Sequence, residues 1–240
     1  MMQAFCEVYP NCPLRISNPE LCLFVTLRQA QCKLCHAVYL TRLNSHHRMG
    51  TMSKKALHGT PLKRFLRDYR RTNPQDFDLV TLLQSIEYPA NVGSCFRLAD
   101  AAGLTELVLT GITPTPPNPT IDKVGRFKST RVPWRYEKDP LTAVYDLKAA
   151  GYRVVAIELT EDAVPYYQFD YQPKTCLVVG HEDHGVTRAT LEACDAAVFL
   201  PMYGKGLSLN VHVALSIVVY HILHCSGAIR LDQSSRLDQS

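Results

Sequence analysis

Five short runs of continuous apolar residues constrain the fold of this chain more than any other feature of its sequence. The runs are DLVTLLQ (78–84), ELVLTG (106–111), RVVAIEL (153–159), TCLVVG (175–180) and AAVFLP (196–201). Strands that are apolar on both faces are typical of a parallel sheet with helices on either side. The sequence therefore predicts an α/β fold, with a parallel sheet and helices on both faces, over residues 77–225.

Helix signals fall between these runs. Apolar residues recur at helical spacing from Gly93 to Ala102, and Gly103 then ends the pattern. Asp139 is suited to cap a helix over Pro140–Ala150, since proline favours the first helical position. The last helix is expected over Leu209–Leu223, and its apolar side chains run nearly all round, so it must be buried somewhere.

The carboxyl ends of such a sheet are the usual place for a nucleotide-type cofactor. A dinucleotide site would show G-x-G-x-x-G after the first strand, and a P-loop would show its lysine motif. The chain has neither pattern in that place. A cofactor at this edge must therefore be held in another way.

The first 51 residues differ from the rest and hold five of the nine cysteines. Cys32 and Cys35 form a C-x-x-C pair near His36, His46 and His47, which is a weak signal for zinc. Residues 1–51 are interpreted as a disordered leader or a non-native extension, with translation starting at Met52. Residues 226–240 repeat RLDQS and are predicted to be a disordered tail.

No apolar run reaches the roughly 18 residues that a membrane-spanning helix needs. The early run over 21–27 follows an acidic residue and lacks a basic segment before it, so it is a poor signal peptide. A cytoplasmic location is expected, in which the nine cysteines stay reduced.

Positive charge is concentrated in one segment. The formal net charge is only +4, yet residues 53–75, within a basic N-terminal extension over 52–76, carry seven lysines and arginines against Asp68 alone. Such a segment suits a polyanionic partner, or it is the solvated face of a helix. Charge alone leaves both interpretations open.

Three polar clusters follow predicted strands, at Asn91–Gly103, Gly180–Thr187 and Gly204–Asn210. In the first, Arg97 lies among apolar residues, and a buried or half-buried arginine needs either an anionic ligand or a nearby aspartate. In the second, His181 and His184 lack a third metal ligand, so no metal is predicted. In the third, Ser208 is suited to cap the last helix, but capping does not explain Asn210.

These clusters resemble, in order and spacing, the three motifs of the SpoU (TrmH-like) branch of the SPOUT RNA methyltransferases. The first motif reads N-x-G-x-x-x-R-x-A-x-x-x-G over 91–103, the second G-x-E-x-x-G over 180–185, and the third L-P-M with S-L-N-V-x-x-A over 200–214. The resemblance covers about residues 79–224. Three motifs in register are a far more specific signal than one.

The resemblance implies a SPOUT fold with a C-terminal trefoil knot and S-adenosylmethionine as cofactor. It implies a homodimer through the last helix and methyl transfer to a ribose 2′-hydroxyl. The implied cofactor-binding residues are Leu159, Gly180, Leu200, Met202, Ser208 and Leu209. The implied catalytic residues are Arg97, Asn91, Glu182, Ser208 and Asn210. Because a guanidinium stays protonated, Arg97 is expected to clamp a phosphate rather than act as a base.

The RNA surface is expected where basic and aromatic residues alternate. One part is the basic extension and the other is the stretch DKVGRFKSTRVPWRY over 122–136. The predicted RNA-binding residues are Lys63, Arg64, Arg67, Arg70, Arg71, Arg126, Lys128 and Arg131. The sequence shows no separate RNA-binding domain of the kind many ribosomal RNA enzymes carry, which favours transfer RNA as substrate.

Other functions stay open on the sequence alone. A ribosomal RNA 2′-O-methyltransferase would carry the same motifs. A non-catalytic RNA-binding protein on the same scaffold would not need the whole set of polar residues. A base methyltransferase of the sister branch would have different knot motifs, and a zinc hydrolase would use His181, Glu182 and His184.

Overall fold

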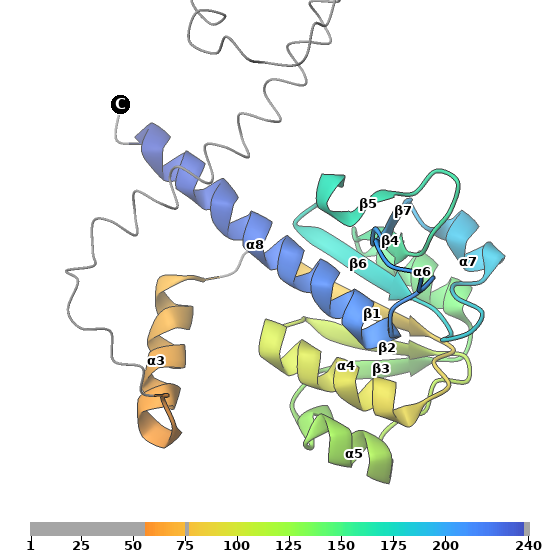
Figure 1. Ribbon diagram of the computed structural model, residues 1–240, viewed down its shortest axis with the longest axis horizontal. Coiled ribbons are helices and arrows are strands. Elements are labelled where there is room, and N and C mark those ends of the chain that lie inside the picture. The colour runs from red at the N-terminus through yellow and green to blue at the C-terminus, as the bar shows by residue number, and fades with distance from the viewer. Residues whose placement is uncertain (1–55, 75–76, 238–240) are drawn as a thin grey trace, which may run out of the picture. The chain divides into compact units, whose positions relative to one another are not determined.

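The computed structural model describes residues 56–74 and 77–237, and the side chains as far as residue 225. The chain divides into a unit of residues 1–65 and a unit of residues 66–240. The second unit holds one parallel sheet of seven strands (Figure 1). The expectations for residues 1–51 lie outside the described residues.

The strands pair in the order β3-β2-β1-β6-β4-β7-β5, and every pair is parallel. Their bounds are β1 Asp78–Gln84, β2 Glu106–Thr110, β3 Trp134–Glu137, β4 Arg153–Ile157, β5 Val164–Pro165, β6 Lys174–Val179 and β7 Ala196–Phe199. The five apolar runs thus form five of the strands, and β3 and β5 lie at the two edges. The parallel sheet predicted from those runs is confirmed.

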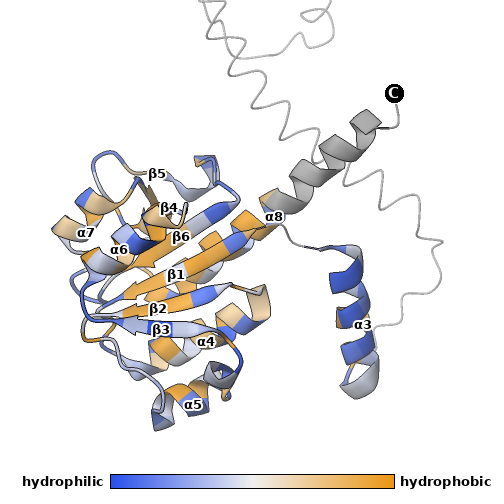
Figure 2. Cartoon of the chain, turned by 180° about the vertical axis from the view of Figure 1, so that it is seen from behind, coloured by the Kyte–Doolittle hydropathy of each residue, from blue (hydrophilic) through white to orange (hydrophobic). Residues whose placement is uncertain are grey.

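The helices cover both faces of this sheet, and Figure 2 shows the apolar strands lying between them. They are α4 Pro89–Ala102, α5 Pro119–Gly125, α6 Pro140–Ala149, α7 Arg188–Ala193 and α8 Val211–Leu237, with short 3-10 turns η1 Lys128–Thr130 and η2 Tyr166–Gln168. Leu79 and Leu83 of β1 point into a core shared with α4 and α8. Val80 and Leu82 point the other way, into a core shared with α6 and α7. This alternation follows from the period of two in a strand.

Caps set several helix bounds. Asp139 caps α6 by accepting from the Leu141 and Thr142 N–H groups, with Pro140 in the first position, as predicted. Gly103 ends α4 in a left-handed conformation at φ 71°. Helix α4 begins at Pro89 rather than Gly93, because proline suits the first turn and Tyr88 is still extended.

Helix α8 differs most from expectation. It begins at Val211 and continues to Leu237, so the predicted disordered tail is helical over 226–237. The physical reason is that alanine, leucine, arginine and glutamine in this segment all favour helix, and no proline interrupts it. The sequence repeat had suggested low complexity and concealed that propensity.

Helix α3 Gly59–Thr72 carries the basic extension, and none of its side chains is buried within the described part of the chain. Its arginines and lysine alternate with apolar residues at helical spacing. Leu62, Phe65, Leu66 and Tyr69 are exposed on it. Of the helices the structure describes, none combines the length and apolar character that crossing a bilayer requires.

Candidate active site

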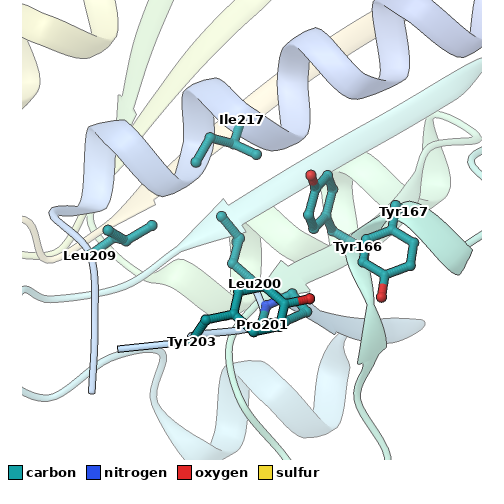
Figure 3. A pocket seen from close by; sticks show the side chains of 7 residues that line it. All are labelled: Tyr166, Tyr167, Leu200, Pro201, Tyr203, Leu209 and Ile217. Carbon is teal, nitrogen blue, oxygen red and sulfur yellow. The ribbon is translucent and has the colours of Figure 1, made fainter. Parts of the chain in front are cut away.

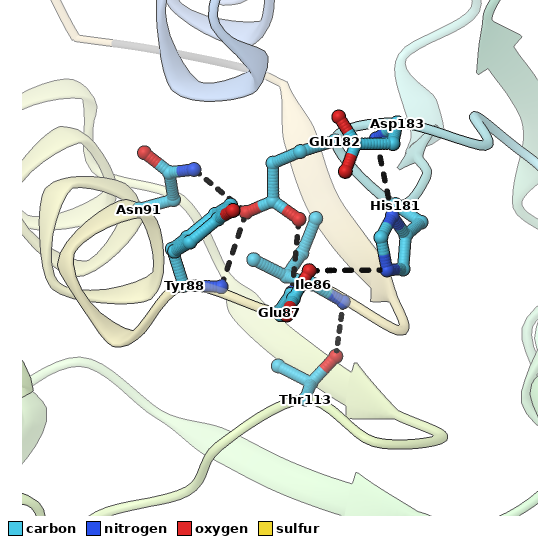
Figure 4. Close-up of polar contacts among 8 residues, drawn as sticks. All are labelled: Ile86, Glu87, Tyr88, Asn91, Thr113, His181, Glu182 and Asp183. Atoms are coloured by element: carbon cyan, nitrogen blue, oxygen red, sulfur yellow. Dashed lines mark hydrogen bonds and ion pairs between the residues drawn. The ribbon is translucent and has the colours of Figure 1, made fainter.

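Glu182 accepts several hydrogen bonds in the polar site at the carboxyl edge of the sheet (Figure 4). It lies in the loop after β6, and one carboxylate oxygen, Oε2, accepts from the Glu87 N–H at 2.9 Å. The other, Oε1, accepts from the Tyr88 N–H at 3.3 Å and from Asn91 Nδ2 at 2.6 Å. Glu182 therefore fastens the loop after β6 to the start of α4.

A second amide continues this chain of hydrogen bonds. Asn210 Nδ2 donates to Asn91 Oδ1 at 3.1 Å, and Asn210 Oδ1 accepts from the His212 N–H at 3.0 Å. Asn91 is buried, and both of its polar atoms are used. Asn91, Glu182 and Asn210, one from each sequence motif, are thus joined directly.

The caps of α4 and α8 differ from simple expectation. Asn91 lies inside the first turn of α4 and does not cap it, since the helix starts before it. The prediction that Ser208 caps the last helix is wrong, because α8 begins at Val211 and Asn210 accepts from the His212 N–H in the capping position. Ser208 is exposed and forms no side-chain hydrogen bond to any described residue.

The surroundings of Glu182 keep it ionised. Partial burial works to raise its pKa, but hydrogen bonds from the Glu87 N–H, the Asn91 amide and the Tyr88 N–H outweigh that effect. The pKa of Glu182 consequently lies below its ordinary value. A charged acceptor here fixes the orientation of the Asn91 amide, and through it that of Asn210.

Arg97 stands apart from this network. It is exposed on α4, whereas the sequence predicted a buried or half-buried side chain. The reason is geometric, because Cys95, Phe96 and Ala99 supply the buried stripe of the helix and Arg97 lies beside it. No carboxylate of the described residues pairs with its guanidinium. Arg97 is therefore available to an anionic ligand.

An apolar pocket of about 220 Å³ lies beside the start of α8 (Figure 3). Two predicted cofactor residues, Leu200 and Leu209, line it together with Pro201, Tyr203, Ile217 and the aromatic pair Tyr166 and Tyr167. The predicted residues Leu159, Gly180, Met202 and Ser208 are not in its lining. Leu159 is instead 71% exposed at the end of β4.

Gly180 has a structural role that spacing did not reveal. A side chain at this position would overlap the backbone of Gly185 and Val186, so the loop can fold back on itself only over a glycine. Glu158 completes the turn, since its carboxylate accepts from the Val186 N–H at 3.0 Å and packs against Gly185. Sequence reasoning missed Glu158 because it lies at the end of a strand far away in the chain.

The predicted RNA-binding residues fall into two groups. Lys63, Arg64, Arg67, Arg70 and Arg71 all lie on α3. The second group lies between α5 and β3, where Lys128 bonds Asp100 at 2.6 Å, Arg131 approaches the same carboxylate at 3.5 Å, and Arg126 is exposed. Lys128 is thus engaged in an ion pair with α4.

His181, one of the two histidines of the second cluster, lies near a carboxylate that the sequence pattern did not associate with it. His181 Nε2 lies 3.6 Å from Glu87 Oε2, and its Nδ1 accepts from the Asp183 N–H at 3.1 Å. Glu87, His181 and Asp183 each offer an atom within 4.8 Å of the others. The contacts among them account for their positions, and the expectation that no metal binds here stays a prediction.

The fold and site together define a class of protein. A parallel sheet covered on both faces, with a polar network and an apolar pocket at its carboxyl edge, is the architecture of nucleotide-cofactor enzymes. Comparison with known families is more specific, since the SpoU rRNA Methylase family matches residues 78–220. The chain belongs to this family.

Relatives and solved structures agree with this assignment. The chain is 35% identical over 143 residues to the 23S rRNA (guanosine(2553)-2'-O)-methyltransferase RlmP of Bacillus subtilis, covering 60% of this chain and 57% of that protein. It is 30% identical to the tRNA (guanosine(18)-2'-O)-methyltransferase of Escherichia coli K12, covering 60% and 62%. The chain thus spans less than two thirds of either relative.

Among solved structures, the A. aeolicus TrmH/SpoU tRNA modifying enzyme matches with a TM-score of 0.57 and 26% identity, over 68% of this chain and 83% of that one. An AdoMet-bound rRNA methyltransferase from Sinorhizobium meliloti matches with the same TM-score of 0.57 and 26% identity, over 63% and 58%. These matches confirm the SPOUT-type fold predicted from the motifs. The trefoil knot itself stays a prediction.

Proposed function

We propose that the chain is an S-adenosylmethionine-dependent RNA methyltransferase that methylates a ribose 2′-hydroxyl, with transfer RNA as the preferred substrate. The observation that carries the proposal is the hydrogen-bonded chain from Asn210 through Asn91 to Glu182. This hydrogen-bonded network joins the three motifs of the family. Both relatives described above are named 2'-O-methyltransferases of guanosine. A protein that only bound RNA would not need this buried and charged arrangement.

The apolar pocket fits part of the proposed cofactor. Its volume of about 220 Å³ is below the roughly 300–1,000 Å³ of whole small-molecule sites. Its aliphatic and aromatic lining, with Leu200 and Leu209, suits the adenine ring. Met202, Ser208, Leu159 and the Gly180 turn are proposed to complete the site around it. When bound, the cofactor supplies an electrophilic methyl group on its sulfonium.

The polar residues of the chain are proposed to position the substrate. Glu182 holds the Asn91 amide, and Asn91 in turn orients Asn210 at the start of α8. Such preorganised groups lower the barrier by fixing the attacking oxygen in line. Arg97 is proposed to bind a phosphate and to stabilise the developing negative charge on oxygen, and the proton leaves through that phosphate or water.

Substrate and assembly are also part of the proposal. The basic face of α3 and the cations between α5 and β3 would grip the RNA backbone without sequence preference. We propose a homodimer through α8 and a cytoplasmic location. Ribosomal RNA is the second candidate substrate, since the B. subtilis relative is named as an enzyme of 23S rRNA.

A methyl-transfer assay tests this function. Labelled S-adenosylmethionine is supplied with bulk transfer RNA or bulk ribosomal RNA in separate reactions, followed by digestion to nucleosides. We expect a 2′-O-methylated nucleoside from the transfer RNA reaction. Label in ribosomal RNA alone would reassign the substrate, and label on a base would contradict ribose chemistry. If the protein shows no methyl transfer and does not bind the cofactor, a non-catalytic RNA-binding protein is favoured.

A further inference from the structure

The turn between α5 and η1 has an unusual backbone. Arg126 and Phe127 are consecutive, neither is glycine, and both adopt left-handed conformations, at φ 51° and φ 56°. A left-handed end to a helix is common, but glycine normally occupies it. For a bulky residue such as phenylalanine this conformation is a true outlier with an energetic cost.

Neighbouring groups fix this conformation from both sides. The Phe127 N–H donates to the Asp122 carbonyl at 3.0 Å, and the Thr130 hydroxyl donates to the Phe127 carbonyl at 2.8 Å. Ser129 Oγ donates to the Asp122 carboxylate at 3.3 Å. The backbone of Phe127 is therefore held in place.

The side chain of Phe127 belongs to neither of the two hydrophobic cores. It is 65% exposed, although it is one of the largest apolar side chains in the protein. The other aromatic residues of this stretch are engaged. Trp134 packs edge-to-face on Phe96 at 6.3 Å, and the Tyr136 hydroxyl donates to the Gly111 carbonyl at 2.7 Å. A strained residue that presents an exposed ring points to a ligand.

The charges around this ring are mostly positive. Arg126 and Arg131 are exposed beside it in sequence. The carboxylate of Asp100, which faces this turn from α4, is paired with Lys128 at 2.6 Å and with Arg131, which remains exposed, at 3.5 Å. The carboxylate of Asp122 is partly occupied by its hydrogen bond from Ser129. The surface therefore favours an anion.

Arg97 belongs to the same surface. On α4, Gly93 packs against Gly125 at the end of α5, and Asp100 contacts Lys128 in η1. Arg97 lies between Gly93 and Asp100 at helical spacing, so it shares the stripe of α4 that faces α5 and η1. An exposed aromatic ring and three exposed arginines thus gather on one surface.

We propose that Phe127 is a stacking platform for an unpaired base of the RNA, with Arg97, Arg126 and Arg131 contacting the phosphates on either side of that base. Aromatic faces bind bases of single-stranded RNA by stacking, and arginines beside them bind the backbone. The inference rests on the proposed function, because it assigns a nucleotide subsite of the RNA substrate. It identifies single-stranded or loop RNA, rather than a duplex, as what this surface binds.

The test measures RNA binding by the full chain in the absence of cofactor. The probes are a single-stranded RNA of about 12 nucleotides carrying one 2-aminopurine, within the usual range of site sizes, and a duplex of the same sequence. Phe127→Leu keeps an apolar side chain but removes the aromatic face. We expect it to weaken single-strand binding by about 10-fold and to reduce quenching of the 2-aminopurine. Duplex binding should change less than twofold.

Two further variants of Phe127 distinguish loss of stacking from a change in the structure or stability of the turn. Phe127→Tyr keeps the ring and should bind the single strand like the parent protein. Phe127→Asn tolerates the left-handed backbone, so its Tm should equal or exceed that of the parent while its affinity falls. The matched control is Tyr145→Leu on α6, which removes another exposed aromatic ring, 59% accessible, from the opposite face of the sheet.

Several outcomes would overturn the inference. Unchanged affinity in Phe127→Leu, an equal loss in Phe127→Tyr, or an equal loss in Tyr145→Leu would each exclude stacking. A change in sedimentation at unchanged RNA affinity would assign Phe127 to a contact between copies of the chain. If the parent protein methylates RNA and any of these contradicting outcomes is found, the stacking site is wrong but the proposed function stands. If it neither methylates nor binds RNA, the proposed function fails as well.

Discussion

At the scale of single residues, the orientation of the side chains in the polar network is fixed, because each of them has few possible hydrogen-bond arrangements. Glu182 can only accept, so Asn91 must present its NH2 group to it and its oxygen to Asn210. One carboxylate thereby determines the orientation of two amides on two different helices. Removing its charge should disturb all three residues together.

Glu182→Gln tests that dependence. The substituted amide would place an NH2 group among three donors, so at least one hydrogen bond is lost. We expect methyl transfer to fall at least about 10-fold and unfolding free energy to fall by about 1–3 kcal/mol, as for a buried donor left unpaired. The measurements are initial rates and urea unfolding. Glu161→Gln, on an exposed loop, is the control and should change neither.

Glu182 also predicts a pH dependence. Its folded pKa lies below the ordinary value of 4.5, so ionised Glu182 stabilises the fold at pH above that value. This contribution is lost as pH falls through the folded pKa. The difference in unfolding free energy between the parent and Glu182→Gln should be constant above about pH 5.5 and shrink below about pH 4.5. A difference that grows on acidification would contradict this assignment.

Substitutions of Arg97 can separate the effect of its positive charge on activity from the effect of its planar guanidinium. If it clamps a phosphate with its planar fork, Arg97→Ala should lower kcat/KM about 100-fold, and Arg97→Lys should recover only part of that loss. Arg188→Lys on α7, whose guanidinium pairs with Glu192, is the control. Full activity in Arg97→Lys would show that charge alone suffices.

The members of the polar network could be predicted from sequence where a motif carries them. The three motifs place Asn91, Glu182 and Asn210 in one site, and the structure shows them joined by hydrogen bonds. The exposure of Arg97 and the cap provided by Asn210 were not predicted, since both depend on where a helix begins. Glu158 could not be predicted, because its partner at Val186 comes from another strand connection and no spacing links them.

At the scale of elements, close contact between α4 and α5 depends on glycine. A methyl group at Gly93 would lie 2.9 Å from the Ile121 carbonyl and 3.1 Å from the Gly125 N–H, which are backbone atoms and cannot turn aside. The sequence pattern of α4 does not reveal that Gly93 meets Gly125, because the partner lies in a separate helix. The contact sets the distance between Arg97 and the turn that carries Phe127.

Gly93→Ala should therefore force the two helices apart. We expect a loss of about 1–3 kcal/mol in unfolding free energy, the usual cost of overpacking, measured by urea or thermal unfolding. The matched control is Gly206→Ala, since no atom lies within 4 Å of a methyl group placed there. A Gly93→Ala protein as stable as the control would mean that α5 can shift without cost.

At the scale of the whole molecule, the parallel sheet with helices on both faces follows from the five apolar runs, and the order of its strands and the length of α8 do not. The strands could be predicted because buried parallel strands are apolar throughout. Helix α8 lacks a polar face to mark its boundary, and Val213 and Tyr220 remain exposed on it, at 37% and 52%. A second copy of the chain would cover these exposed apolar side chains, as the proposed dimer through α8 requires.

The proposed dimer through α8 predicts a specific change in mass. Introducing charge at these positions, in Val213→Glu and Tyr220→Glu, should convert a dimer to a monomer, because an unpaired carboxylate in an apolar interface is strongly unfavourable. Sedimentation equilibrium measures the mass, and circular dichroism checks that the fold is kept. The control is Tyr145→Glu, an exposed aromatic on α6. If the parent is monomeric, or if only the control dissociates, α8 is not the interface, and its exposed apolar side chains require a different partner.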